Sequence, residues 1–283
     1  MTALAIDIGG TKILLALVRD GDILASHRMA TNIAAGPDAL IDTVAEAAGR
    51  WSGDYDTVGA AVTGAIRGGL WRALNRSTLD LPGSYPLADA LAERLGKPAR
   101  CVNDAQAAAW GEHVAGAGAG RGMAFLTVST GIGGGIVLDG RLLEGLAGNF
   151  GQFVDETGAR VEDRAAGRWI AREAAALGRP ANAEIVFASA HEAWAEALIA
   201  ASAERVATLC RNLQLAIDPE IIVIGGGIGL ATGYLDLVRT ALPDIDPTLR
   251  PHLVPAALGA DAGIIGVAAL AEDLRTNNRE NRQ

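Results

Sequence analysis

The sequence predicts an α/β protein built from two similar lobes with a cleft between them. Apolar strand segments alternate with helical segments along the chain, which is typical of α/β layers. A strand, a glycine-rich turn and a second strand open the chain at residues 4–18, and the same pattern recurs at 123–140. A stretch of small residues, 115–122, directly precedes the recurrence and marks the boundary between the lobes.

The first, smaller lobe is expected to comprise residues 1–117. Asp38 directly precedes an apolar-periodic run, which is a signal for the start of a helix. The expected elements are the opening hairpin, strands at 22–29, 57–62 and 99–102, and helices at 38–50, 86–95 and 105–113.

The second, larger lobe is expected to comprise residues 118–260. After the recurring hairpin come a long helix at 196–215 and an apolar run that ends in a glycine turn at 221–230. We expect a last helix at 261–270, within a C-terminal segment 261–272 that packs back on the first lobe. The polar residues 272–283 are expected to form a disordered tail.

Composition and charge limit the possible functions. The chain is 50% hydrophobic and 20% charged, as is typical of a soluble globular protein. A net charge of -9 without a basic stretch argues against nucleic-acid binding. No apolar run reaches the length of a membrane span, and Cys101 and Cys210 show no pairing pattern. These features predict a cytoplasmic enzyme that binds neither nucleic acid nor a membrane.

The opening hairpin carries a carboxylate, Asp7, inside an apolar strand, where it needs a cation or a ligand. Gly9 and Gly10 permit a tight turn whose amide groups can point at a phosphate. Thr11 and Lys12 add two further phosphate donors. Taken alone, the pattern fits a plain hairpin with a Gly-Gly turn equally well.

The recurring hairpin is richer in glycine. Four of the six residues 130–135 are glycine, a severe entropic load for an ordinary hairpin. Thr127, Ser129 and Thr130 add hydroxyl groups on the same edge. This turn therefore predicts contact with phosphate.

A third glycine turn, 225–229, lies between a strand and a helix, where α/β proteins place nucleotides. A dinucleotide site would need an acid at a strand end about 20 residues further on. Asp244 has nearly that spacing but follows Pro243 in a turn, so a mononucleotide is favoured.

Asn103 and Asp104 lie where a short strand passes into a helix, at an edge facing the other lobe. An amide beside a carboxylate can hold sugar hydroxyls, and the carboxylate can accept a proton as general base. Alternatively, Asp104 caps the helix expected to begin at Ala105. The two roles are compatible.

These four motifs occur in the order and spacing of the ROK family of sugar kinases, which the chain resembles over residues 4–270. The resemblance implies the actin-like (ribonuclease H-like) ATPase fold, a homodimer, and ATP with Mg²⁺. Local stretches at 63–67, 73–75, 103–110 and 145–148 resemble bacterial N-acetylmannosamine kinases.

The implied activity is ATP-dependent phosphorylation of the 6-hydroxyl of N-acetylmannosamine, an amino sugar. A glucokinase or another N-acetylhexosamine kinase of the same family is the alternative. A non-catalytic, sugar-responsive regulator is a further alternative, against which the retention of Asp104 argues.

The resemblance also implies individual roles. Asp104 is implied as the catalytic base, and Asp7 as a residue near the Mg²⁺ bound with ATP. The implied ATP- and phosphate-binding residues are Asp7, Gly9, Gly10, Thr11, Lys12, Thr130, Gly131, Gly133, Gly226 and Gly227, with the last two at the adenosine. The implied sugar-binding residues are Asn75, Asn103, Asp104, Asn149, Gln152 and Glu162.

The chain departs from the family pattern at the sugar-binding edge. The family usually has an acid or histidine followed three residues later by a histidine, where this chain has Asn149 and Gln152. Many members then carry three cysteines of a zinc loop, but residues 153–160 contain none, so zinc is not expected. Glu162 matches the sugar-binding glutamate that follows the loop, and its alternative role is a surface or helix-cap acid.

Overall fold

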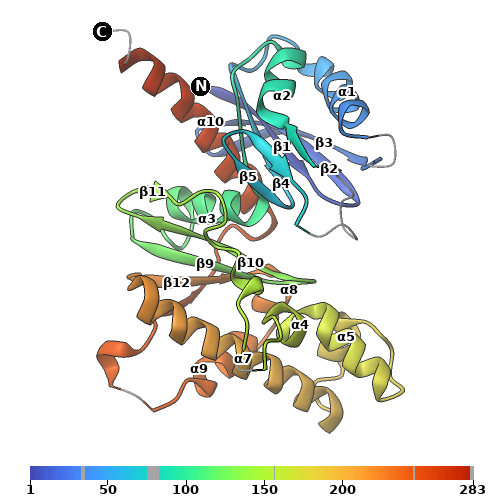
Figure 1. Cartoon of the computed structure of the whole chain (residues 1–283), viewed down its shortest axis with the longest axis vertical. Helices are drawn as coiled ribbons and strands as arrows, with labels where there is room; N and C mark the ends of the chain where they lie inside the picture. Colours follow the sequence, from blue (N-terminus) through green and yellow to red (C-terminus); the bar gives the residue numbers. More distant parts are fainter. Residues whose placement is uncertain (33–35, 75–82, 156, 245, 281–283) are drawn as a thin grey trace.

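The structure is a computed structural model and describes residues 1–32, 36–74, 83–155, 157–244 and 246–280. It consists of two lobes, each built on a mixed sheet (Figure 1). Two helices, α3 (Asp104–Ala115) and α10 (Ala262–Glu280), lie between the sheets, with α10 on the first sheet and α3 on the second.

The sheet of the first lobe consists of β1 (Thr2–Ile8), β2 (Lys12–Arg19), β3 (Asp22–Ala30), β4 (Thr57–Val62) and β8 (Ala99–Asn103). Its strand order is β3-β2-β1-β4-β8. β2 is antiparallel to both of its neighbours, whereas β4 is parallel to β1 and β8. The opening hairpin and the three further strands expected in this lobe are therefore confirmed.

The sheet of the second lobe consists of β9 (Met123–Val128), β10 (Ile132–Leu138), β11 (Arg141–Leu142), β12 (Ile221–Gly225) and β13 (Leu253–Pro255). Its order, β11-β10-β9-β12-β13, repeats that of the first sheet, with the same antiparallel and parallel pairings. The recurring strand-turn-strand pattern thus folds twice in the same way, which confirms the prediction of two similar lobes.

β1 shows how one strand serves two layers, because successive side chains point to opposite faces of a sheet. Ile6 packs toward α1 (Pro37–Ala48) and α2 (Leu87–Leu95), which cover the outer face. Ala5 faces α10, where its small side chain lets the helix approach closely. Asp7 is two residues beyond Ala5 in the strand, so its side chain points to the same, inner face of the sheet.

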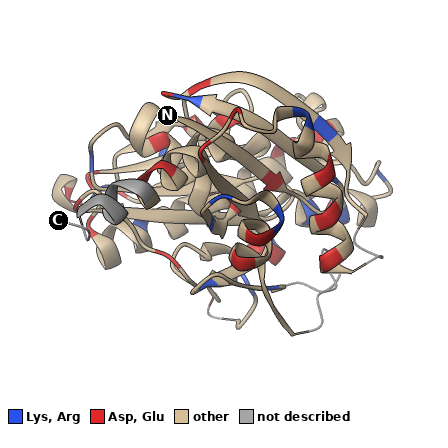
Figure 2. Cartoon of the chain, turned by 90° about the horizontal axis from the view of Figure 1, so that it is seen from above, with Lys and Arg blue, Asp and Glu red and all other residues tan. Residues whose placement is uncertain are grey.

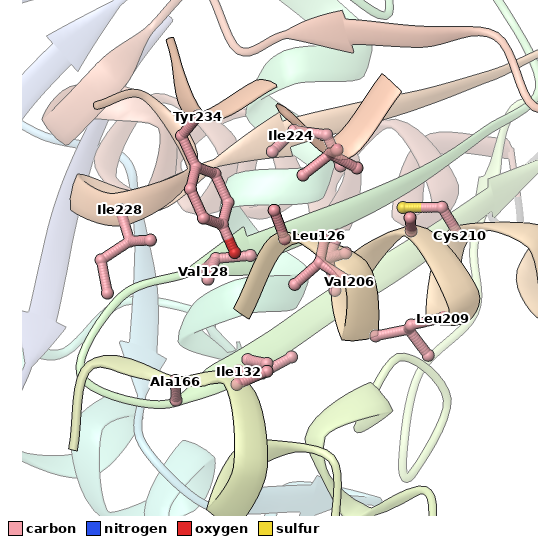
Figure 3. Close-up of a cluster of buried hydrophobic side chains, with 14 of the residues drawn as sticks. Leu126, Val128, Ile132, Ala166, Val206, Leu209, Cys210, Ile224, Ile228 and Tyr234 are labelled. Carbon is pink, nitrogen blue, oxygen red and sulfur yellow. The ribbon is translucent and has the colours of Figure 1, made fainter. Parts of the chain in front are cut away.

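β9 works in the same way in the second lobe. Leu126 points to the outer face and packs with α7 (Ala193–Ile217), as Figure 3 shows, whereas Phe125 faces α3. The buried Tyr234 hydroxyl and Ser202 Oγ form a hydrogen bond of 2.7 Å inside this core. Further helices of this lobe are α4 (Glu162–Ala165), α5 (Gly167–Ala176), α6 (Ala183–Ala188), α8 (Gly226–Gly229) and α9 (Tyr234–Ala241).

The two central helices touch backbone to backbone. A Cβ atom on Gly266 of α10 would lie 1.8 Å from the carbonyl oxygen of Ala107. A Cβ atom on Gly111 of α3 would lie 2.1 Å from the carbonyl oxygen of Ala262. Side chains at these two positions would separate the helices, so glycine sets how closely α3 and α10 approach.

Glu112, near the C-terminal end of α3, is a fully buried carboxylate. Its Oε2 accepts hydrogen bonds from the backbone N–H groups of Ala117, at 2.8 Å, and Ala257, at 3.0 Å, and its Oε1 accepts one from Leu258 at 2.8 Å. These bonds compensate the cost of burying a charged group. They also tie the segment after α3 to the segment before α10.

The last helix extends further than the sequence predicted. α10 runs to Glu280, whereas we expected the helix to end at 270 and residues 272–283 to be a disordered tail. That expectation is wrong for residues 272–280, which are helical. Residues 271–280 contain neither glycine nor proline and begin with strong helix formers, so no stop signal is present.

A small sheet in the first lobe was not predicted. It consists of β5 (Ala65–Arg67), β6 (Leu70–Arg72) and β7 (Ser84–Pro86), and its strands are too short to show a period. The fully buried Trp71 anchors it, because its indole Nε1 donates a hydrogen bond of 2.8 Å to the carbonyl oxygen of Thr63.

The sequence has no long run of charged residues of one sign. Acidic and basic positions are interspersed along the ribbon (Figure 2). Among the helices that the structure describes, none combines the length and apolar character needed to cross a membrane.

We expect Gly266→Ala to lower the free energy of unfolding by about 1–3 kcal/mol, because the added methyl group overpacks the contact with α3. Chemical denaturation followed by tryptophan fluorescence measures this change. Gly263→Ala is the matched control in the same helix: its Cβ would lie 4.0 Å from the nearest atom, the Asp104 carbonyl oxygen. The control should leave stability unchanged or raise it by up to about 1 kcal/mol. Equal effects of the two substitutions would contradict the prediction.

Candidate active site

A cavity of about 620 Å³ lies between the two lobes. The turns of both glycine hairpins line it, together with the first residues of α3 and α10 and parts of the segment 149–168. Of the residues predicted for the site, the lining includes Asp7, Gly9, Gly10, Asn103, Asp104, Thr130, Gly131, Gly133, Asn149, Gln152, Glu162 and Gly226. Motifs that are far apart in the sequence thus meet at one place.

Other predicted residues lie elsewhere. Thr11 and Lys12 are exposed at the tip of the opening hairpin, where Gly9 N donates to Lys12 O at 3.0 Å, and they are not among the described residues that line the cavity. Gly227 in α8 is also outside this lining. Asn75 lies outside the described residues.

Asn103, not Asp104, occupies the N-cap position of α3. Asn103 Oδ1 accepts hydrogen bonds from Ala105 N at 3.0 Å and Gln106 N at 3.2 Å, and its Nδ2 donates to Gly64 O at 2.8 Å. Asp104 is the first residue of the helix, and its Oδ1 accepts from Ala105 N at 2.8 Å. Because Asn103 performs the capping, the exposed side chain of Asp104 remains available to the cavity.

Two carboxylates share the floor of the cavity. Burial raises the pKa of Asp7 from its ordinary 3.8 to about 6, and the negative charge of Asp104 adds to this shift. Desolvation also raises the pKa of Asp104, because protein surrounds this carboxylate on all sides but the cavity, whereas hydrogen bonding from Ala105 lowers it. Both groups thus accept protons more readily than exposed aspartates do.

The glycines of the second hairpin serve two purposes. Gly131 and Gly133 line the cavity. A Cβ on Gly134 would lie 2.6 Å from the ring of Phe150, and one on Gly135 would lie 2.5 Å from the Cβ of Ala109 in α3. Gly135 therefore lets α3 lie close against β10, so part of the glycine richness reflects packing and not phosphate contact.

Glu162 is held by three neighbouring side chains and is 11% exposed. Gln152 Nε2 donates to its Oε1 at 2.9 Å, and Arg160 Nη1 lies 3.2 Å from the same oxygen. Arg168 Nη2 lies 3.7 Å from Oε2. Glu162 thus lines the cavity. It is the first residue of α4, whose N-cap is Val161, and it is largely buried, so the alternative of a surface or helix-cap acid is wrong.

The loop that carries Asn149 is attached to α3. The amide nitrogen of the buried Gln106 lies within hydrogen-bond distance of three carbonyl oxygens, at 3.3 Å from Leu143 and Gly145 and at 2.7 Å from Ala147. Asn149 Nδ2 donates to Leu146 O at 3.0 Å. The helix that begins with Asp104 therefore also positions this wall of the cavity.

The segment after Gln152 does not offer the ligands of a zinc site. Residues 153–160 contain neither cysteine nor histidine, and Cys101 and Cys210 are buried in β8 and α7. The Thr157 hydroxyl donates to Asp155 Oδ1 and is the main cause of the lowered pKa of Asp155. The N–H groups of Thr157, at 2.9 Å, and Ala159, at 3.1 Å, donate to the same oxygen and lower this pKa further. This carboxylate closes the loop, and residues 153–160 lack the cysteine and histidine from which structural zinc sites are mostly built.

Arg160 and Arg168 line the cavity, although neither was predicted as a site residue. Neither belongs to a glycine motif or an acid-amide pair, so no local pattern distinguishes them from surface arginines. Thr127 and Ser129, whose hydroxyls we expected on the edge of the second hairpin, also line the cavity.

Two lobes of like topology, with a glycine hairpin from each facing a common cleft, define the actin-like class of ATPase folds. The sequence pattern of the ROK family matches residues 3–274, and the chain belongs to this family.

The chain is similar to several characterised or solved members. It is 47% identical over 276 residues to a Brucella melitensis protein named bifunctional enzyme NanE/NanK, covering 95% of this chain but 53%, about half, of that protein. It is 39% identical to a Vibrio cholerae protein named N-acetylmannosamine kinase, covering 95% of this chain and 98% of that one. A ROK family glucokinase from Streptomyces griseus, solved with glucose and AMPPNP, superposes with a TM-score of 0.79 at 28% identity, covering 96% and 100%.

We expect Asp104→Asn to lower the pKa of Asp7 below about 6, because a neighbouring negative charge no longer opposes its ionisation. Burial should still hold that pKa above 3.8. Carboxyl-carbon NMR titration in the absence of Mg²⁺ measures the shift. Since a raised pKa makes ionisation of Asp7 destabilising, the variant should also lose less stability as pH rises from 3.8 to about 6. An unchanged Asp7 pKa would show that the two carboxylates do not interact.

Proposed function

We propose that the chain is an ATP-dependent sugar kinase that phosphorylates the 6-hydroxyl of N-acetylmannosamine. The observation that carries the proposal is the position of Asp104, at the floor of a cleft faced by two glycine hairpins. The name of the Vibrio cholerae relative, which matches nearly the full length of both chains, supports this amino sugar as the acceptor.

Asp104 is the catalytic base in this proposal. Its carboxylate accepts the proton of the sugar hydroxyl while the hydroxyl oxygen forms a bond to the γ-phosphorus and ADP leaves. A pKa raised by desolvation favours this proton transfer. Asn103 holds Asp104 in place by capping α3, and its second amide hydrogen is left for the sugar.

The glycine turns bind the nucleotide in this proposal. Backbone N–H groups at Gly10, Gly131 and Gly133, with the Thr130 hydroxyl, face the phosphates. Gly9, whose own N–H is bonded to Lys12 O, lets the backbone approach them closely. Gly226, where a Cβ would lie 2.4 Å from Val128 O, borders the adenosine together with Gly227. Thr11 and Lys12 reach the phosphates only if the hairpin tip moves toward the cavity as the lobes close.

Asp7 fits the Mg²⁺ that accompanies ATP. It is a carboxylate in the cavity with a raised pKa, and a divalent cation would relieve the repulsion from Asp104. Carboxylate oxygen is a preferred ligand of Mg²⁺. Bound there, the ion would neutralise charge on the transferred phosphoryl group.

The sugar lies against Asn149, Gln152 and Glu162, with Asn75 as a further contact carried over from the family resemblance. Glu162 accepts hydrogen bonds from sugar hydroxyls, and Gln152 and Arg160 hold it in orientation. Two neutral amides at positions 149 and 152 bind hydroxyls without supplying charge. Glucose and other N-acetylhexosamines are therefore the competing acceptors.

The proposal also includes a homodimer in the cytoplasm, as the family resemblance implies. Size-exclusion chromatography with light scattering determines the number of chains.

Release of ADP, measured against a panel of hexoses and N-acetylhexosamines, should be fastest with N-acetylmannosamine. Asp104→Asn should lower kcat by about 10²-fold to 10⁴-fold, because the base is lost. N-acetylmannosamine binding, measured by calorimetry, should persist in this variant.

Asp236→Asn is the control, because this carboxylate lies in α9 with its side chain 78% exposed. Its kcat should equal that of the unmodified protein. Faster turnover with glucose would change the assigned substrate, and unchanged turnover of Asp104→Asn would refute Asp104 as the base. A panel without any turnover would favour the regulator.

Zinc removal should leave turnover unchanged, since residues 153–160 contain none of the cysteines of the family's zinc loop and no histidine. The protein is dialysed against a zinc-selective chelator and then assayed with ATP and added Mg²⁺, and its zinc content is measured by mass spectrometry. A loss of turnover that zinc restores would contradict this prediction.

A further inference from the structure

Two arginines, Arg160 and Arg168, are the basic residues among the described side chains that line the cavity. Three carboxylates line the same cavity. A nucleoside triphosphate would add further negative charge, so binding it requires positive groups close by. The two arginines are therefore the groups to consider for charge compensation.

The guanidinium of Arg160 is already occupied by the protein. Its Nε and Nη2 donate to the two carboxylate oxygens of Asp163 at 2.7 and 3.0 Å. Its Nη1 lies 3.2 Å from Glu162 Oε1. Arg160 is thus a fixed part of the wall and has little capacity left for a ligand.

The guanidinium of Arg168 is far less engaged. Its ion pair with Glu162 Oε2 spans 3.7 Å, which is longer than a hydrogen bond. No described residue accepts a hydrogen bond from it, and its side chain is 50% exposed. A planar group with five N–H donors therefore faces the cavity largely unused.

The backbone of Arg168 is attached to the second glycine turn. Gly167 N donates to Ser129 O at 2.8 Å, and Arg168 N donates to Thr130 O at 3.2 Å. The guanidinium lies over the same turn, because a Cβ on Gly131 would be 3.5 Å from Arg168 Nη2. Helix α5 thus fixes the arginine next to the residues proposed to bind phosphate.

We propose that Arg168 binds the phosphate groups of the nucleotide. The proposal rests on the kinase function proposed above. Its guanidinium fork matches two phosphate oxygens, a geometry that lysine cannot reproduce. Glu162 holds the free guanidinium near the turn until the nucleotide arrives, and the stronger phosphate contact then replaces the loose ion pair.

Calorimetric binding of Mg²⁺–AMPPNP and of adenosine tests the proposal, because adenosine lacks phosphate. The protein is compared with Arg168→Ala, Arg168→Lys and the control Arg172→Ala. Arg172 lies one turn further along α5, pairs with Glu173 at 3.0 Å and is not among the described lining residues.

Arg168→Ala should weaken AMPPNP binding about tenfold or more, the usual effect of losing charged hydrogen bonds. Adenosine affinity should stay unchanged, and Arg172→Ala should bind both ligands like the unmodified protein. Arg168→Lys keeps the positive charge but lacks the guanidinium fork. Its AMPPNP affinity should therefore lie between that of the unmodified protein and that of Arg168→Ala. If Arg168→Ala does not fold, the test uses Arg168→Lys alone. Its ratio of AMPPNP affinity to adenosine affinity should be lower than that of the unmodified protein, and an unchanged ratio would overturn the proposal.

Unchanged AMPPNP affinity, or an equal loss for AMPPNP and adenosine, would overturn the role of Arg168. If the unmodified protein binds AMPPNP but phosphorylates no sugar, only the proposed function fails and the comparison for Arg168 still holds. If the unmodified protein does not bind AMPPNP, both proposals fail.

Discussion

The backbone contact between α3 and α10 is the constraint on which the rest of the structure depends. α10 belongs by packing to the first sheet and α3 to the second, so Gly111 and Gly266 set the separation of the lobes. On its other side, α3 rests against β10 at Gly135. Asp104 is the first residue of this helix. Its position in the cleft therefore depends on two close contacts of α3, one with α10 and one with β10, and both contacts require glycine.

Much of the fold could be predicted because long elements carry their own periodic signal. The strand at 57–62 was predicted with its observed bounds, since the β-branched Thr57 and five apolar residues follow Asp56 and precede Thr63. The strands β5, β6 and β7 have three residues each, too few to establish a period. The end of α10 was missed because polarity alone is not a helix stop.

Only part of the candidate site could be predicted from the sequence. Asp7 could be identified because a carboxylate inside an apolar strand needs a cation or a ligand. Asp104 could be identified because it forms an amide-carboxylate pair with Asn103 where a strand passes into a helix. Arg160 and Arg168 could not, because an arginine in a polar segment acquires meaning only from its tertiary neighbours. Gly134 and Gly135 were predicted as part of the glycine turn, whereas they lie in β10, where Phe150 and α3 occupy the space beside them.

The buried carboxylate of Glu112 has a consequence for motion. It joins the two segments through which the chain passes between α3, α10 and the second sheet, at Ala117 and at residues 257–258. A rotation of one lobe against the other would leave this point in place and move the far rim of the cleft most. Glu112 would thus lie at the hinge between the two lobes. Its three backbone hydrogen bonds would be kept while the cleft opens and closes.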